Sequence, residues 1–342
     1  MSGGLIKRVY SAKRNVDIGG GVDKAGLPGS VGIPSMLRRF VARRAPDGIK
    51  NAVDEVNEVT EWIYVVGGYI GSAYLSSVER YDGSAWSSAP AMATARAAHG
   101  VAVYSGLLYA VGGINSGSGT LSSVERYDGS AWSSAPGAGA NMATARAGHG
   151  VAVYNGLLHA VGGDSGSGPL STMERYDGSA WSSAPAMATA RRGHGVAVYN
   201  GLLYAVGGIN SGSGTLSSVE RYDGSAWSSA PGAGANMATA RNNHGVAVYN
   251  GLLYAVGGNS GSAYLSSVEV FDGMSWSTAP AMATARYLHG VAVYNGLLYA
   301  VGGYSSGSGF LSSVEVFDGM SWSTATSLPE GLTGMALAVY NK

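Results

Sequence analysis

His289-Gly290-Val291-Ala292-Val293-Tyr294-Asn295-Gly296-Leu297-Leu298-Tyr299-Ala300-Val301-Gly302-Gly303 is one of five nearly identical segments, the others beginning at His99, His149, His194 and His244. The valines near its start alternate with other residues, as in a β-strand. Asn295-Gly296 then suits a two-residue turn, because both positions require positive φ. Residues 297–301 form a nearly continuous apolar run, which is expected of a strand buried on both faces. The segment therefore predicts a β-hairpin that ends at the Gly-Gly pair.

The hairpin is followed each time by further strand patterns at a regular period. Gly-Gly pairs fall at 67–68, 112–113, 162–163, 207–208, 257–258 and 302–303, with spacings that alternate between 45 and 50 residues. After each pair come a Gly/Ser loop, a strand such as 121–127, an Asp-Gly turn and a short strand that carries a tryptophan. Four short strands per period predict the blade of a β-propeller.

The two ends of the repeat region complement each other. Residues 338–341 copy the middle of the first hairpin strand, but no second strand follows them. Residues 62–68 copy the second strand, but no first strand precedes them. We therefore expect the C-terminal strand to pair with the strand that begins at Trp62, which removes open sheet edges. The predicted fold class is all-β, a six-bladed propeller of four-stranded antiparallel blades closed by the C-terminal strand.

The repeats resemble the kelch motif. The resemblance rests on the Gly-Gly pair after an apolar strand, a following Tyr or Phe, the Trp after it and an Arg before the next repeat, and it covers about residues 62–341. The gap from Tyr81 to Trp86 is shorter than in the usual kelch repeat. The resemblance implies a six-bladed β-propeller that serves as a platform for binding proteins or glycans.

Composition divides the chain into two parts. It has 342 residues, 46% of them apolar, and no cysteine, which excludes disulfides, cysteine metal sites and thiol catalysis. Residues 1–50 carry ten Lys/Arg against three Asp, a balance of +7, whereas residues 51–342 carry eleven Lys/Arg against eighteen Asp/Glu, a balance of −7. We expect a basic, Gly-rich N-terminal extension at 1–58 and a propeller at 59–342. The extension either meets a separate surface or is solvated or folded back on its own acidic body.

One segment of the extension can form a short basic amphipathic helix. Residues 35–44 follow Pro34, and their apolar side chains share one face. Such a helix can dock on a partner, an anionic membrane or nucleic acid, or pack on the protein's own body; we expect a protein partner rather than nucleic acid. Lys7 and Arg8 interrupt any secretory signal, and no apolar run can span a membrane, so we expect the cytoplasm or a virion or surface assembly. The residues assigned to anchoring are Leu37, Arg38, Arg39, Phe40, Arg43 and Arg44.

Charged and histidine residues recur with the repeats. Each blade carries a Glu, and five copies carry an Arg before the next blade, which we interpret as structural ion pairs. The sixth Arg position is Leu332, so we expect one Glu to lack this partner. Five histidines also recur, with Met335 at the sixth place. They can bind an anion or a metal near the axis, but a residue copied with every blade is more often part of the blade's own structure.

Catalysis finds little support in the sequence. Kelch-type copper oxidases depend on a Tyr–Cys crosslink, which this chain cannot form without cysteine. Kelch-type sialic-acid mutarotases use charged residues in the central mouth, where Asp164 is the one candidate here. No nucleophile elbow, P-loop or calcium loop occurs. We expect a non-enzyme without cofactor or metal, and the alternative is a carbohydrate-active enzyme of the mutarotase type with a central-mouth site.

Positions that differ between nearly identical repeats predict a binding face. With the strands of each blade named a to d, the pair between Arg and His lies in the d–a connection, and the pair after Gly-Gly lies in the b–c connection. Both connections open onto the same face of a propeller. In kelch adaptors these loops read a peptide, so the resemblance implies a peptide or glycan site; neutral drift in exposed loops is the alternative. The predicted binding residues are Tyr69, Ala98, Asn115, Gly148, Asp164, Arg192, Asn210, Asn243, Asn259, Tyr287 and Tyr304.

The last two blades carry a second difference. Val270 and Val316 replace arginines of the Arg80 type, and Met274 and Met320 replace serines. We expect these four residues to form an exposed apolar patch that receives the extension or a partner subunit. The sequence favours a non-catalytic propeller that binds a protein or glycan and is anchored to a larger assembly through its extension. The arrays look like those of marine bacteria and their viruses, a resemblance that implies a virion or surface component.

Overall fold

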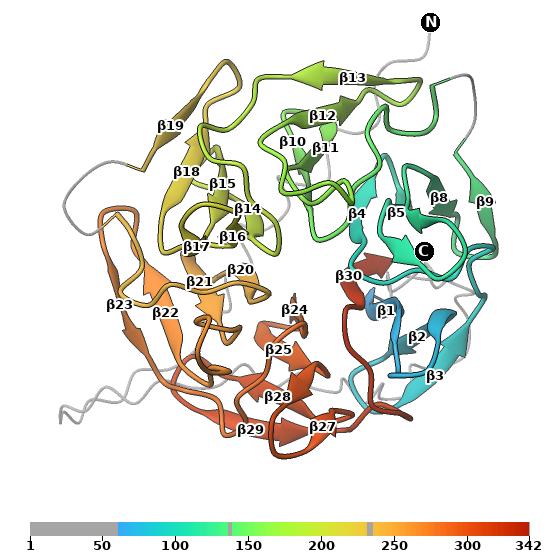
Figure 1. Cartoon of the computed structure of the whole chain (residues 1–342). Coiled ribbons are helices and arrows are strands. Elements are labelled where there is room, and N and C mark those ends of the chain that lie inside the picture. The colour runs from blue at the N-terminus through green and yellow to red at the C-terminus, as the bar shows by residue number, and fades with distance from the viewer. Residues whose placement is uncertain (1–60, 136–138, 231–234, 342) are drawn as a thin grey trace, which may run out of the picture. The chain divides into compact units, whose positions relative to one another are not determined.

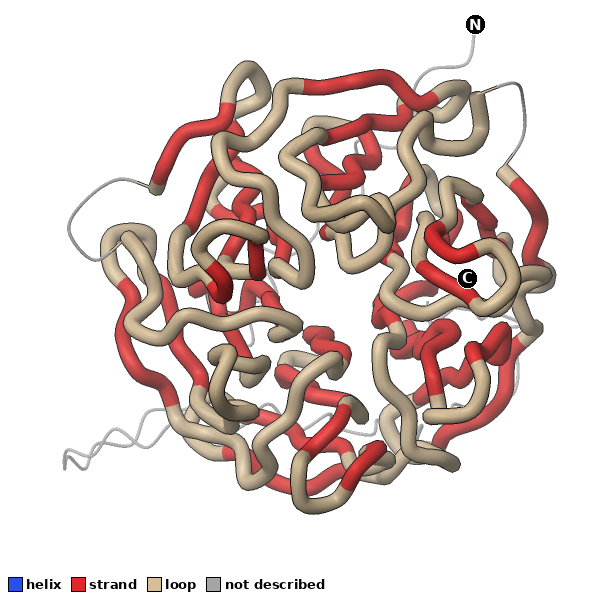
Figure 2. The backbone as a smooth tube through the Cα atoms, in the orientation of Figure 1, coloured by secondary structure: helices blue, strands red, loops and turns tan. Residues whose placement is uncertain are grey.

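The computed structural model describes residues 61–135, 139–230 and 235–341, and all regular structure in these ranges is β-strand. Six four-stranded antiparallel sheets stand around a common axis (Figure 1), and most of the loops are drawn over one face of the ring (Figure 2). The predicted all-β, six-bladed propeller is therefore confirmed. The basic extension at 1–58, with the proposed helix and its anchoring residues, lies outside the described residues.

Within each blade, strand a is nearest the axis and strand d is outermost. Blade 1 consists of β30 (Ala336–Asn341), β1 (Glu61–Tyr69), β2 (Tyr74–Tyr81) and β3 (Trp86–Ala89). The other blades, in the same order a to d, are β4 (Gly100–Tyr104), β5 (Leu107–Val111), β8 (Val124–Tyr127) and β9 (Trp132–Ser134); β10 (Gly150–Tyr154), β11 (Leu157–Val161), β12 (Met173–Tyr176) and β13 (Trp181–Ala184); β14 (Gly195–Tyr199), β15 (Leu202–Val206), β18 (Val219–Tyr222) and β19 (Trp227–Ser229); β20 (Gly245–Tyr249), β21 (Leu252–Val256), β22 (Val268–Phe271) and β23 (Trp276–Ala279); and β24 (Gly290–Tyr294), β25 (Leu297–Val301), β28 (Val314–Phe317) and β29 (Trp322–Ala325).

The b–c loops of blades 2, 4 and 6 each contain a short two-stranded antiparallel ribbon. The ribbons are β6 (Ile114–Asn115) with β7 (Gly119–Thr120), β16 (Ile209–Asn210) with β17 (Gly214–Thr215), and β26 (Tyr304–Ser305) with β27 (Gly309–Phe310). At the opposite ends of the blades the a–b hairpins turn as predicted. Asn295 and Gly296 have φ of 48° and 74°, as a type I′ turn requires.

The C-terminal strand closes the ring as predicted. Strand β30 pairs antiparallel with β1, with Trp62 opposite Tyr340 and Val66 opposite Ala336. The first and last described strands thus lie in one sheet, and the a strand of blade 1 comes from the other end of the chain. Closure leaves the a strands of all six blades facing the axis, where they contact one another.

Five buried arginines join successive blades. Arg191 crosses from the d–a loop after blade 3 into blade 4, where Nη1 donates to the carbonyls of Gly207 (2.7 Å) and Ser218 (3.0 Å) and Nη2 donates to Glu220 (2.7 Å). The Glu220 carboxylate also accepts two backbone N–H groups from the same loop, at 2.7 and 3.0 Å. The predicted Glu–Arg pairing is confirmed as a structural clamp. Equivalent ion pairs are Arg96–Glu125, Arg146–Glu174, Arg241–Glu269 and Arg286–Glu315.

A tryptophan lies at the outer rim of each seam, and in five of the six seams its Nε1–H donates to a backbone carbonyl of the preceding blade, Trp132 being the exception. Trp227 is half-buried, lies 5.4 Å from the ring of Tyr222 in its own blade and donates Nε1–H to the carbonyl of Pro185 in the preceding blade (3.0 Å). Between clamp and rim lie the apolar b strands, in which residues such as Leu203 and Val206 are completely buried. Packing of these side chains against the next blade supplies the hydrophobic part of each seam.

Removing one member of a clamp should destabilise the fold strongly. Arg191→Met leaves Glu220 as a buried, unpaired charge, so we expect the free energy of unfolding to fall by about 3–5 kcal/mol. The double variant Arg191→Met, Glu220→Gln should recover part of this loss. Arg192→Met is the matched control, because the Arg192 side chain is half exposed and its surface ion pair is worth about 1 kcal/mol or less. Chemical denaturation measures all three, and equal losses in the single and double variants would contradict the clamp.

Candidate interaction face

Each Gly-Gly pair turns the chain from strand b onto the loop face. Gly207 and Gly208 have φ of 62° and 98°, a region that favours glycine. A Cβ on Gly207 would lie 2.5 Å from the carbonyl oxygen of Arg241, and one on Gly208 would lie 2.8 Å from the Cβ of His194. The pair therefore lets each b–c loop pack closely against the d–a loops on both sides.

Backbone bridges join the two variable loop sites. The N–H of Arg192 donates to the carbonyl of Ile209 at 3.1 Å, and the N–H of Ile209 donates back at 2.9 Å. The d–a and b–c positions that vary between repeats thus lie side by side on one face of the propeller. The equivalent bridges are Ala97–Ile114, Ala147–Asp164, Asn242–Asn259, Tyr287–Tyr304 and Thr333–Tyr69.

The next residue of each d–a loop belongs to a closed ring of backbone hydrogen bonds around the axis. Each of the six N–H groups donates to the carbonyl of its counterpart in the preceding loop, at 2.6–2.9 Å. All six residues have positive φ, between 49° and 63°. The ring fixes the mouth of the propeller through the backbone alone, so its side chains are free to differ. Its members are Ala98, Gly148, Gly193, Asn243, Leu288 and Gly334.

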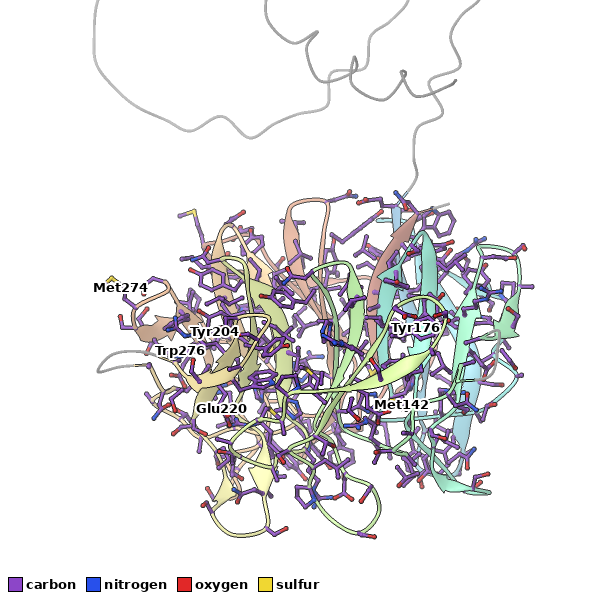
Figure 3. All side chains as sticks on the ribbon, turned by 90° about the horizontal axis from the view of Figure 1, so that it is seen from above. Met142, Tyr176, Tyr204, Glu220, Met274 and Trp276 are labelled. Atoms are coloured by element: carbon purple, nitrogen blue, oxygen red, sulfur yellow. The ribbon has the colours of Figure 1, made fainter. Side chains whose placement is uncertain are left out.

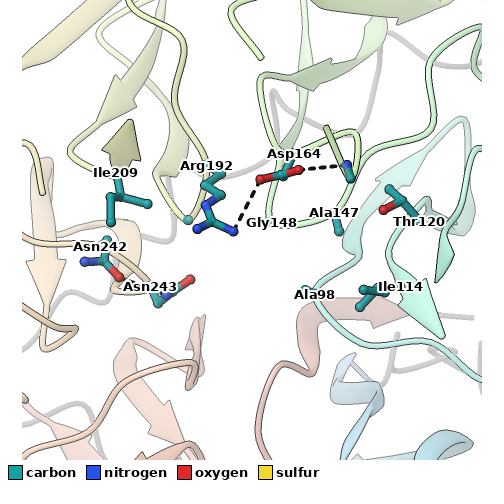
Figure 4. A pocket seen from close by; sticks show the side chains of 12 residues that line it. Ala98, Ile114, Thr120, Ala147, Gly148, Asp164, Arg192, Ile209, Asn242 and Asn243 are labelled. Atoms are coloured by element: carbon teal, nitrogen blue, oxygen red, sulfur yellow. Dashed lines mark hydrogen bonds and ion pairs between the residues drawn. The ribbon is translucent and has the colours of Figure 1, made fainter. Parts of the chain in front are cut away.

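A depression of about 520 Å³ lies at the mouth over blades 2 to 4 (Figure 4). Asp164 and Arg192 form an ion pair at the rim of the depression, with 3.3 Å between Oδ2 and Nη1. The other carboxylate oxygen of Asp164 accepts the N–H of Gly166 at 2.7 Å. The predicted binding residues that the depression brings together are Ala98, Gly148, Asp164, Arg192 and Asn243.

Three predicted binding residues are asparagines that cap their own loops. Asn115 Oδ1 accepts the N–H groups of Gly117 and Ser118 at 3.1 and 2.7 Å, and Asn210 makes the same two contacts in blade 4. Asn259 Oδ1 accepts the N–H two residues further on at 2.6 Å. These side chains therefore shape the b–c loops by Asx turns.

Six aromatic side chains form a continuous row on the other half of the loop face, in blades 5, 6 and 1. Centroid distances along the row are 4.4 Å for Tyr264–Tyr287, 5.8 Å for Tyr287–Tyr304, 5.3 Å for Tyr304–Phe310, 6.1 Å for Phe310–Tyr69 and 5.0 Å for Tyr69–Tyr74. All six are half-buried. We call this set the aromatic arc. The arc contains the predicted binding residues Tyr69, Tyr287 and Tyr304 and none of those that line the depression at the mouth.

Sequence comparison missed the other half of the aromatic arc. Tyr74, Tyr264 and Phe310 each precede the leucine that ends the b–c loop, a third variable position at which blades 2, 3 and 4 have Thr120, Pro169 and Thr215. Aligning the repeats at this leucine, rather than at the Gly-Gly pair, reveals the position. When the repeats are aligned at the Gly-Gly pair, these positions do not coincide, because the b–c loops of blades 2, 4 and 6 are one residue longer than those of blades 1 and 5.

The arc is uncharged at physiological pH. Burial, together with the hydrogen bond to Tyr264, raises the pKa of Tyr287 to about 12, so its phenol stays protonated. From Gly-Gly to the next Ser-Ser, the b–c loops of blades 5, 6 and 1 contain no Asp, Glu, Lys or Arg. The arc therefore offers ring faces, hydroxyls and backbone groups rather than charge.

The four residues of the predicted apolar patch differ in exposure. Met274 and Met320 sit at the tips of Asp-Gly turns and are 77% and 83% exposed, and Met274 projects from the outer edge of the ring (Figure 3). Val270 and Val316 are half-buried and pack against the apolar clusters between blades. The exposed apolar surface at this rim is thus contributed mainly by the two methionines.

Five histidines and Met335 surround a second hollow of about 150 Å³ at the axis. The histidines are 5–7% exposed, and none of their ring nitrogens makes a hydrogen bond of good geometry. His194 packs on the preceding blade, since a Cβ on Gly162 would lie 2.8 Å from its Cε1. Across the described ranges, no three His, Asp or Glu side chains are grouped so that they could hold a metal ion. The imidazoles are buried between adjacent blades, where the five histidines border this hollow.

The ring of blades, the Gly-Gly turns and the bridged loops define a propeller built to present one variable face. Comparison with protein families matches the Kelch motif six times, at residues 63–93, 95–138, 145–188, 190–233, 240–283 and 285–329. The chain belongs to the kelch-repeat family, whose propellers are commonly protein-interaction modules. A search of curated proteins finds no match to it. Among the described residues, no helix has the length and apolar character needed to cross a membrane.

The buried histidines should make the fold sensitive to acid. Burial, reinforced by the neighbouring arginine, lowers the pKa of His99, His194 and His289 to about 3, and the same causes place the pKa of His149 and His244 well below the usual range. The unfolded state takes up these protons below about pH 6.5, so stability is lost as the pH falls towards about 3, at about 1.4 kcal/mol per pH unit for each histidine.

A single substitution tests this linkage. His194→Met copies the residue that the sixth seam carries at Met335. We expect it to reduce the slope of unfolding free energy against pH near pH 5 by about one sixth, because burial also lowers the pKa of His159, so that one of six histidine protons no longer takes part. Denaturant unfolding at a series of pH values gives the slope. An unchanged slope would mean that the histidines are not neutral in the folded protein.

Proposed function

We propose that this protein is a non-catalytic interaction module that binds a protein partner across its loop face, with the aromatic arc as the main contact. The observation that carries the proposal is the one-sided distribution of aromatic residues. Three variable positions in each repeat face this side of the ring, and the aromatic residues at them fall in blades 5, 6 and 1 alone. Among copies that otherwise match closely, such clustering favours a binding surface over drift.

The chemistry of the arc suits a neutral protein surface. Tyrosine offers a large, rigid and amphipathic contact area that loses little conformational entropy, and Ser, Gly and Asn add adaptable hydrogen bonding. The loops around the arc have this composition. Aromatic residues also dominate the binding energy of protein interfaces. A neutral glycan can use the same ring faces and hydroxyls, so it is the ligand against which the test must discriminate.

The mouth favours recognition over catalysis. Asp164 is the acidic residue that the mutarotase alternative would require there. Both of its carboxylate oxygens are engaged, one by Arg192 and the other by the loop backbone. A carboxylate held in this way orients its loop and supplies a fixed dipole at the rim of the depression.

The basic composition of residues 1–50, ten Lys/Arg against three Asp, supports anchoring through the extension at 1–58. Strand β1 runs from Glu61 to Tyr69, and Tyr69 belongs to the loop face. The chain therefore enters the propeller at the opposite face. We propose that the extension anchors the propeller to a larger assembly, such as a virion or cell surface.

Substitutions that copy other blades test the arc without disturbing the fold. Tyr287→Asn reproduces Asn242 of the preceding seam, and Phe310→Thr reproduces Thr120 and Thr215. With ligands selected from a random peptide display library on the full chain, we expect each variant to bind at least about tenfold more weakly, as interface hot spots do. Thr120→Ser, at the position of Phe310 but in blade 2, should bind as the wild type does.

The outcomes separate the possible ligands. Affinities measured by surface plasmon resonance that are unchanged in both arc variants would reject the arc as the contact. A glycan array probed with the same proteins covers the second class of ligand. Binding to neutral glycans, lost in Tyr287→Asn and Phe310→Thr, would keep the surface and replace the protein partner by a saccharide.

A further inference from the structure

The seam between blade 6 and blade 1 has the arginine slot of the other seams but not the arginine. In the seam between blades 1 and 2, Arg96 fills the slot: Nη1 lies 2.7 Å from the carbonyl oxygen of Gly112 and 3.1 Å from that of Ser123, and Nη2 lies 2.7 Å from Glu125. Four further copies of this arrangement define what the slot recognises, namely a planar guanidinium held by two carbonyls and a carboxylate.

At the sixth seam the corresponding acceptors line a small cavity. Gly67, Ser77 and Glu79 are the counterparts of Gly112, Ser123 and Glu125. Together with Leu332, which stands in the place of the arginine, they border a cavity of about 30 Å³. Leucine fills only the space of an arginine's aliphatic stem and carries no donor, so the guanidinium end of the slot stays open. The remaining lining residues are Val65, Leu75, Pro329 and Glu330.

The carboxylate in this slot also lacks its backbone donors. Glu125 accepts the N–H groups of Ala93 and Thr94, but the counterpart of Ala93 in this seam is Pro329, which has no N–H. Within the described part of the chain, the Glu79 carboxylate accepts one hydrogen bond, from the Ser88 hydroxyl at 3.1 Å. It is half-buried, whereas its five counterparts are buried. In each of the other five seams the corresponding acceptors bind a guanidinium group. At the sixth seam they can therefore accept further hydrogen bonds, and Glu79 is accessible to solvent.

We infer that this slot is a binding site for a guanidinium group, supplied by an arginine side chain from outside the propeller. Entry of the guanidinium group displaces one or two waters, which is what a cavity of this size holds. It also requires the exposed side chain of Glu330 to change its conformation. Arginine is favoured over lysine because its planar fork reaches a carboxylate and carbonyls together. Two sources share this chemistry: an arginine of the basic segment 35–44, or an arginine of a separate partner. The inference does not depend on the loop face.

Methylguanidinium is the probe for the slot itself. Isothermal titration is made on the full chain and on a variant in which Arg38, Arg39, Arg43 and Arg44 are changed to lysine, with methylammonium as the control for general ionic effects. At least one of the two proteins should show saturable binding of methylguanidinium in the millimolar range. Glu79→Gln should weaken this binding at least tenfold, and Leu332→Arg should abolish it by filling the slot from within. Leu332→Arg should also raise the melting temperature, and adding Glu79→Gln should cancel that rise, which shows that the new arginine occupies the intended place.

Lysine substitutions in the extension identify the source. If Arg38, Arg39, Arg43 or Arg44 already occupies the slot, the wild-type chain will not bind methylguanidinium, but the variant with all four changed to lysine will. Binding to the wild-type chain instead assigns the slot to an arginine of a partner. The inference is overturned if neither protein binds the probe, if methylammonium binds equally well, or if binding persists in a folded Leu332→Arg variant.

Discussion

The buried arginine is the contact on which the propeller depends, because it belongs to two blades at once. The backbone of Arg191 hydrogen-bonds to blade 3, through Leu170 and Gly163, while its side chain is satisfied in blade 4. A buried charge is stable only when it is paired and hydrogen-bonded. The pairing therefore fixes the distance between adjacent blades and their relative position along the propeller axis. Repetition of this constraint around the axis aligns the loops on one face.

The arginine begins a four-residue segment, Arg-x-x-His, that organises five of the six seams. The first intervening residue bridges to the next b–c loop, the second completes the hydrogen-bonded ring around the axis, and the histidine packs on glycines of the preceding blade. Both intervening residues act through their backbones, so their side chains vary without loss of the fold. The fold is thus carried by backbone atoms of this segment, which leaves its side chains for the recognition that we propose.

The repeats predict the fold almost completely, because every blade satisfies the same physical requirements. Hairpin turns, Gly-Gly pairs and the split first blade predicted six blades and circular closure, and the Glu and Arg periods predicted the ion pairs. The candidate site was predicted less well. Asn115 and Asn210 vary in the right loop but cap it, and Tyr264 and Phe310 stand at a position that length differences between loops displaced from the alignment. Side-chain direction within a loop depends on local hydrogen bonds that periodicity does not describe.

The seam between blades 6 and 1, where the two ends of the propeller meet, lacks the buried ion pair that joins the other blades. There, leucine and proline replace the arginine and a backbone donor, and Met335 replaces the histidine, so Leu328, Leu332 and Met335 join one apolar cluster. Pairing of β1 with β30 supplies hydrogen bonds that bind blade 1 to the chain from blade 6. Glu79 remains tolerable because water reaches it; a carboxylate buried as deeply as Glu125 would be strongly destabilising without its arginine. Apolar packing and strand pairing therefore replace the polar clamp, and the partial exposure that makes this possible also opens the slot to a guanidinium group.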